Sequence, residues 1–101
     1  MNYQKIILAG NVTDEPRSLI SQKGDVSYTT FGVGVGDGKE RTTFFSILAF
    51  GKLGEAVANH VTKGRQVLVA GRVQVSDKGR FRVIADTVRF GSEPNAAKAS
   101  E

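Results

Sequence analysis

Residues 51–64, "GKLGEAVANHVTKG", interrupt a sequence that otherwise alternates in hydrophobicity, and they decide the order of the predicted elements. Leu53, Val57 and Val61 lie four residues apart, the spacing of one face of an amphipathic helix. Gly64 then follows as a helix stop signal. The segment therefore predicts a short helix of about two to three turns.

Apolar residues alternate with a period of two on both sides of this helix, which is the pattern of half-buried β-strands. Three strands are predicted before it, with inward faces formed by Ile6, Leu8 and Val12, by Phe31, Val33 and Val35, and by Phe45, Ile47 and Ala49. Two strands follow, one marked by Val67, Val69, Val73 and Val75, and one over residues 80–90. The turn signals "TDEPR", "QKGD", "GDGKE" and "SDKG" separate the strands.

This order predicts an all-β fold with one short helix. Five strands with a helix between the third and the fourth are the layout of the OB-fold, a five-stranded Greek-key barrel. We expect this domain over residues 1–91. Residues 92–101 are small and polar, and we expect them to form a short flexible C-terminal tail.

The composition excludes several classes of protein and leaves the partner open. No apolar run approaches the ~20 residues of a membrane span, so no membrane partner is expected. The absence of cysteine excludes disulfides and favours an intracellular protein. The net charge is +4, and residues 39–90 hold ten of the 14 Lys and Arg against four of the ten Asp and Glu. This excess suits an anionic partner, or it only keeps the surface soluble.

The glycine-rich stretch "FGVGVGDGKE", residues 31–40, admits two interpretations. A phosphate-binding loop needs a helix directly after its glycines, and here another strand pattern follows, so we reject a nucleotide loop. Alternation instead directs Gly32, Gly34 and Gly36 outward. A bare strand face lets another backbone or a flat ring approach closely, or it only allows barrel curvature or a bulge, and the two interpretations are compatible.

The outward face of the following strand carries the candidate site, because Phe44, Leu48 and Phe50 alternate with its inward residues. Aromatic rings among basic residues are typical of single-stranded nucleic-acid binding, in which rings stack on bases and cations contact phosphates. The alternative is that the rings pack in the core or at a subunit interface. The predicted binding residues are Phe44, Phe50, Phe81, Lys39, Arg41, Lys52, Arg72, Gln74, Lys78, Arg80 and Arg82.

The segments "KIILAGNVTDEP", "TTFGVGV", "TFFSILAFGKLGEAVANHVTKGRQVLVAGRV" and "IADTVRF" resemble the bacterial single-stranded DNA-binding protein family over about residues 3–90. The resemblance implies sequence-independent binding of unpaired DNA in replication, recombination or repair, in the cytoplasm at the nucleoid. It also implies a homo-oligomer, with a tetramer favoured over a dimer. Phe44 falls where the family usually has a stacking tryptophan, and Phe50 where it has a stacking phenylalanine.

The sequence also departs from the family pattern. It has no tryptophan, so each stack should be weaker, and the hairpin at "SDKG" is short where the family often has a long DNA-wrapping loop. Most members end in an acidic tip with a terminal phenylalanine, whereas this sequence ends "NAAKASE". We therefore do not expect tail-mediated protein partners. Either the sequence is truncated, or it is a compact variant such as a phage protein or a primosome-like relative.

No catalytic site is predicted, and no cofactor or metal is expected. His60 is the single histidine, and without cysteine it cannot form a histidine–cysteine metal cluster. We expect a structural role for it on the helix. Two alternatives to the DNA-coating function remain: a primosome-type OB-fold that binds proteins with secondary nucleic-acid binding, and an RNA-binding OB domain similar to the cold-shock proteins.

Overall fold

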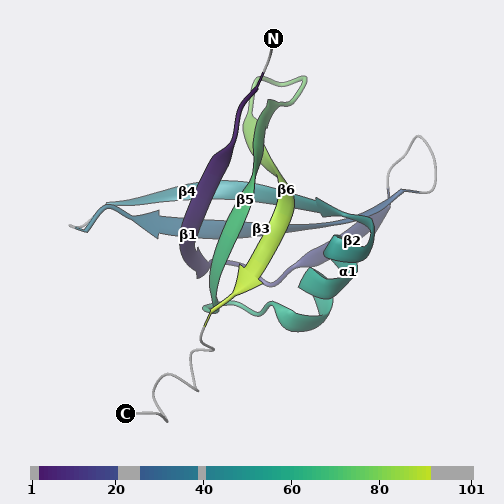
Figure 1. Cartoon of the computed structure of the whole chain (residues 1–101), viewed down its shortest axis with the longest axis horizontal. Coiled ribbons are helices and arrows are strands. Elements are labelled where there is room, and N and C mark those ends of the chain that lie inside the picture. Colours follow the sequence, from purple (N-terminus) through teal and green to yellow (C-terminus); the bar gives the residue numbers. More distant parts are fainter. Residues whose placement is uncertain (1–2, 21–25, 39–40, 92–101) are drawn as a thin grey trace.

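The computed structural model describes residues 3–20, 26–38 and 41–91, which form six strands and one helix (Figure 1). The elements are β1 (Ile6–Val12), β2 (Arg17–Ile20), β3 (Ser27–Gly36), β4 (Thr42–Phe50), α1 (Gly51–His60), β5 (Gln66–Val75) and β6 (Phe81–Phe90). The predicted turn at residues 22–25 and the predicted tail at residues 92–101 lie outside the described residues.

Five of these strands close into a barrel. They are hydrogen-bonded in the order β1-β5-β6-β4-β3, and β3 pairs back onto β1 where Val33 faces Val12. The β4–β6 pair is parallel, and the other pairs are antiparallel. With α1 between β4 and β5, this arrangement confirms the predicted OB-fold.

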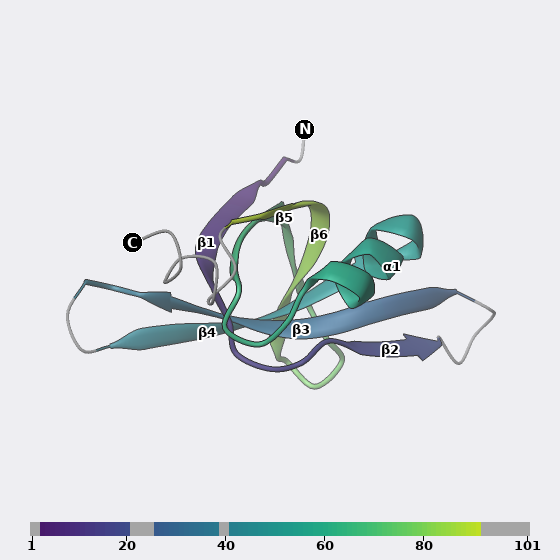
Figure 2. The ribbon, with the colours of Figure 1, turned by 90° about the horizontal axis from the view of Figure 1, so that it is seen from below.

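The sequence did not predict β2. This strand has only four residues, all exposed, and it pairs with the first part of β3, from Arg17 opposite Thr30 to Ile20 opposite Ser27. Figure 2 shows it beside β3, outside the barrel. A strand with no buried face has no hydrophobic alternation, so the pattern that predicted the other five was absent.

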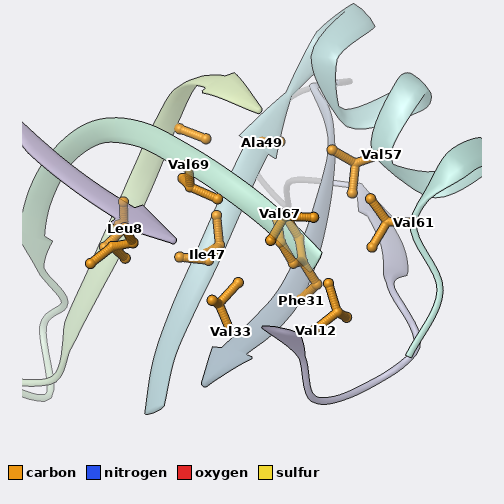
Figure 3. Close-up of a cluster of buried hydrophobic side chains, with 12 residues drawn as sticks. Leu8, Val12, Phe31, Val33, Ile47, Ala49, Val57, Val61, Val67 and Val69 are labelled. Atoms are coloured by element: carbon orange, nitrogen blue, oxygen red, sulfur yellow. The ribbon is translucent and has the colours of Figure 1, made fainter. Parts of the chain in front are cut away.

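The core occupies the barrel interior and is closed at one end by α1 (Figure 3). Its largest fully buried side chains are Ile47, Val33, Val57, Val67 and Val69. The predicted inward faces are confirmed, except that Val75 is 54% exposed. β6 pairs with β4 only at Val83 and Ile84 in the described structure, so the hairpin that contains Val75 extends beyond the barrel.

The helix is confirmed, but it ends earlier than predicted. α1 stops at His60, and Val61 already has an extended backbone while its N–H donates to the carbonyl of Val57. Gly64, with a φ of 90°, lies in the turn before β5, where its N–H donates to the carbonyl of Val12. The glycine therefore forms a turn against β1 rather than the helix terminus. No helix in the described part of the chain is long and apolar enough to cross a membrane.

Candidate nucleic-acid interface

The outer faces of β3 and β4 form the floor of a groove. Four cross-strand pairs follow one another along it: Gly34–Phe44, Gly32–Ser46, Thr30–Leu48 and Tyr28–Phe50. The distance from the first pair to the last is about 20 Å at the usual strand rise. A cavity of about 900 Å³ covers the Phe44 end, and a second of about 330 Å³ covers Leu48 and Tyr28. Both include Thr30 and Ser46, so they form one surface, the β3–β4 groove.

Three aromatic rings are exposed at this groove or beside it. Phe44 and Phe81, which line it, are 70% and 73% exposed. Phe50 is 41% exposed, and its ring lies 5.6 Å from that of Tyr28, centroid to centroid. The outward direction of Phe44 and Phe50 agrees with the prediction from strand alternation. Rings this exposed leave apolar surface in water, as at a surface that binds flat apolar groups.

Leu48 does not share this exposure, which corrects the expectation that it faces solvent. It is only 7% exposed, although it points to the same face as Phe44. At Leu48, β4 lies between β3 and β6, and Phe81 from the hairpin lines the same cavity. Phe44 has a paired strand on one side only, β3, in the described structure. Burial on this face therefore depends on neighbouring strands as well as on side-chain direction.

At Gly32 the structure shows which group lies against the bare outer face of β3. A Cβ on Gly32 would overlap the hydroxyl of Thr13 and stand 3.2 Å from a carboxylate oxygen of Asp14. The N–H of Thr13 also donates to the carbonyl of Gly32 at 2.9 Å. The bare strand face at this position thus allows the expected close approach of another backbone, which is the chain's own β1–β2 loop, and not of a ligand ring.

The wall of the groove beside Phe44 carries mixed charge. It is formed by the β1–β2 loop and the start of β2, which contribute Asp14, Glu15 and Arg17. Glu15 is tied to the turn after α1, because its carboxylate accepts a 3.2 Å hydrogen bond from the N–H of Lys63. Among the described residues, this end of the groove therefore combines two carboxylates with one guanidinium beside Phe44.

The opposite end of the groove is cationic. Arg80 and Arg82 line it together with Phe81. Nε and Nη2 of Arg82 donate to Oε1 of Gln74 at 3.2 and 3.1 Å, which fixes the guanidinium against β5. Both cations belong to the β5–β6 hairpin, whose tip is closed by hydrogen bonds between Ser76 and Arg80.

The remaining predicted residues lie around the groove rather than in it. Gln74 and Lys78 line a cavity of about 410 Å³ on the flank of the hairpin, together with Arg82. Arg41, Lys52 and Arg72 are exposed and line neither cavity of the groove. Lys39 lies outside the described residues.

Several polar residues that line the groove were not predicted as site residues from the sequence: Thr13, Asp14, Glu15, Arg17, Tyr28, Thr30, Ser46 and Ser76. Arg17 was missed because β2 was not predicted. Tyr28 and Thr30 have the same parity as the outward glycines of β3, so continuing the alternation toward the start of that strand would have identified them.

No group of three or more His, Asp or Glu in the described ranges is arranged to hold a metal ion. The ring of His60 packs 5.8 Å from that of Phe90, between centroids, which is a structural contact.

A model of the single-strand binding protein family matches residues 3–90. The chain belongs to this family. The single-stranded DNA-binding protein of Thermotoga maritima is 33% identical over 98% of this chain and 81% of its own length. That of Clostridium perfringens is 33% identical over 88% of this chain and 59% of its own. The crystal structure of wild-type single-stranded DNA binding protein from Thermus aquaticus has a TM-score of 0.76 at 28% identity, covering 90% of this chain.

The chain spans only 41% of that Thermus aquaticus protein. The similarity therefore concerns the OB-fold domain. The family is non-enzymatic, in agreement with the expectation from sequence that the chain is not an enzyme.

Proposed function

We propose that the chain binds and protects single-stranded DNA without sequence specificity during replication, recombination or repair. The observation that carries the proposal is the β3–β4 groove, about 20 Å long at the strand rise, with exposed rings along it and arginines at one end. Bases stack on Phe44, Phe50 and Phe81. Stacking is sequence-tolerant, because every base has a flat face, and contributes roughly 1–3 kcal/mol per base in single-strand binders of this class.

Phosphate contacts come from the cations around the rings. Arg80 and Arg82 lie in the groove, and the hydrogen bonds to Gln74 hold Arg82 in place before DNA arrives. Arg17 adds a cation beside Phe44. We also assign phosphate contacts to Arg41, Lys52, Arg72 and Lys78, which lie around the groove, and to Lys39.

We further propose that the chain forms a homo-oligomer, with a tetramer favoured over a dimer by the family resemblance. The surface that supports this lies on the outer faces of β1 and β5, away from the groove. Ile7 is 63% exposed and Leu68 38% exposed there, and Ala9, opposite Leu68, is also exposed. A second copy covering these side chains would remove apolar surface from water. We assign the protein to the cytoplasm, at the nucleoid.

The test compares strands of equal length. Fluorescence anisotropy with a labelled oligo(dT) should give saturable binding, and a duplex of the same length should bind much more weakly. Light scattering with and without the oligonucleotide gives the oligomeric state and the stoichiometry together. Equal affinity for duplex and single strand would contradict the stacking mechanism. Weak binding that does not saturate would favour the primosome-type protein-binding module.

A further inference from the structure

The β1–β2 loop places one carboxylate, that of Asp14, in the cavity that Phe44 also lines. The loop is anchored on one side of Asp14 by the 2.9 Å hydrogen bond from the N–H of Thr13 to Gly32. It is anchored on the other side by the bond between Glu15 and the N–H of Lys63. Asp14 lies between these anchors, with a carboxylate oxygen 3.2 Å from where a Cβ on Gly32 would stand.

This position is within reach of a base that stacks on Phe44. Gly32 lies two residues from Gly34 along β3, a separation of about 7 Å. Gly34 is the residue opposite Phe44, and the edge of the Phe44 ring comes to 3.4 Å from a Cβ built on Gly34. Asp14 and Phe44 also line the same cavity. A base stacked on the ring can therefore bring part of its edge to the carboxylate.

The carboxylate has no partner within the described structure. Asp14 is exposed, and no hydrogen bond or ion pair joins its side chain to another described residue. An ionised carboxylate accepts hydrogen bonds and donates none. A phosphate would be repelled here, so the group that suits Asp14 in a DNA groove is a donor on a base edge.

We infer that Asp14 biases the groove toward bases that present an amino group, and toward cytosine among the pyrimidines. Cytosine carries an N4 amino donor where uracil and thymine carry the O4 acceptor, and carboxylates accept from cytosine N4. The bias is superimposed on stacking by Phe44, which serves every base. This inference rests on the proposed function, because it requires a base on that ring.

The test measures affinity for oligo(dC) and oligo(dU), two strands whose bases both lack the thymine methyl group. The variant is Asp14→Asn, whose amide can accept from cytosine or donate to uracil. The matched control is Glu15→Gln, which removes the same charge from the same wall and keeps the oxygen that accepts from Lys63.

In the Asp14→Asn variant, we expect the dC-to-dU affinity ratio to fall roughly three- to tenfold below the wild-type ratio, which is the range for the net contribution of one ordinary hydrogen bond in a water-accessible groove. Glu15→Gln should tighten both strands equally and leave the ratio unchanged. An unchanged ratio in Asp14→Asn overturns the inference, and so does an equal change of ratio in Glu15→Gln. If the wild-type chain binds neither strand, the proposed function fails with it, so the two failures are distinguishable.

Discussion

Replacing Phe44 with alanine separates binding from stability. The ring is 70% exposed on the outer face of β4, and no core side chain depends on it. Only about 30% of a ring of roughly 200 Å² is then buried, so the truncation removes about 60 Å² of buried apolar area. At about 25 cal/mol per Å², it costs at most about 1.5 kcal/mol of stability.

The expected effect on binding is larger. Loss of the ring on which one base stacks should cost roughly 1–3 kcal/mol of binding free energy, which raises Kd about five- to 150-fold. The weakening should be similar for oligo(dT) and oligo(dA), because a ring offers no hydrogen bond to distinguish them. Fluorescence anisotropy at fixed salt gives the Kd values, and circular dichroism shows whether the variant is folded.

Ile20→Ala is the matched control for this experiment. Ile20 is 71% exposed and lies on β2 opposite Ser27, on the face turned away from the groove. Its truncation should leave Kd within about twofold of wild type, as for a surface position without a partner. If Phe44→Ala is folded and binds as tightly as Ile20→Ala, then no base stacks on Phe44 and the reasoning from ring exposure is wrong.

Three further variants test the remaining parts of the structure. Phe44→Trp introduces the only tryptophan of the chain, and its fluorescence should be quenched on saturable binding of oligo(dT); unchanged emission on binding would contradict stacking at this position. Arg82→Ala should weaken binding and flatten the dependence of log K on log salt by about 0.7 for each phosphate that the variant no longer neutralises, whereas Lys63→Ala, in the turn after α1, should keep the wild-type slope. Thr29→Val removes the buried hydroxyl that donates to α1 at 2.8 Å, and it should lower the free energy of unfolding by about 1 kcal/mol in urea titrations; an unchanged midpoint would contradict a stabilising role for this bond.

Most of the fold could be predicted because the barrel interior imposes alternation directly on the sequence. Val33, Ile47 and Val69 are fully buried, and each lies on the face that its period-two pattern indicates. β2 left no such signal, because its pairing with β3 is made by backbone groups and all four of its side chains are exposed. The helix was predicted to end too late because Gly64 was taken as a helix stop signal. In the structure Gly64 forms a turn instead, and its N–H donates to a carbonyl of β1.

The sequence predicted which side chains of the site point outward, but not which strands lie beside them. Alternation correctly turned Phe44 and Phe50 outward, yet it could not show that β6 lies beside β4 at Leu48 and buries that side chain. Pairing between strands that are distant in the sequence decides which outward positions meet solvent. A single sequence contains little information about that pairing.

Gly32 shows how the fold and the proposed chemistry depend on one residue. Because it lacks a Cβ, Thr13 and Asp14 can lie flat against β3, and the β1–β2 loop becomes a wall of the groove instead of standing away from it. A side chain at this position would displace Thr13 and Asp14 together. Gly32→Val should therefore weaken the dC preference attributed to Asp14 while leaving the Phe44 ring on its strand. Retention of the full preference in a folded Gly32→Val protein, as measured by the dC-to-dU ratio, would show that the loop does not depend on this contact.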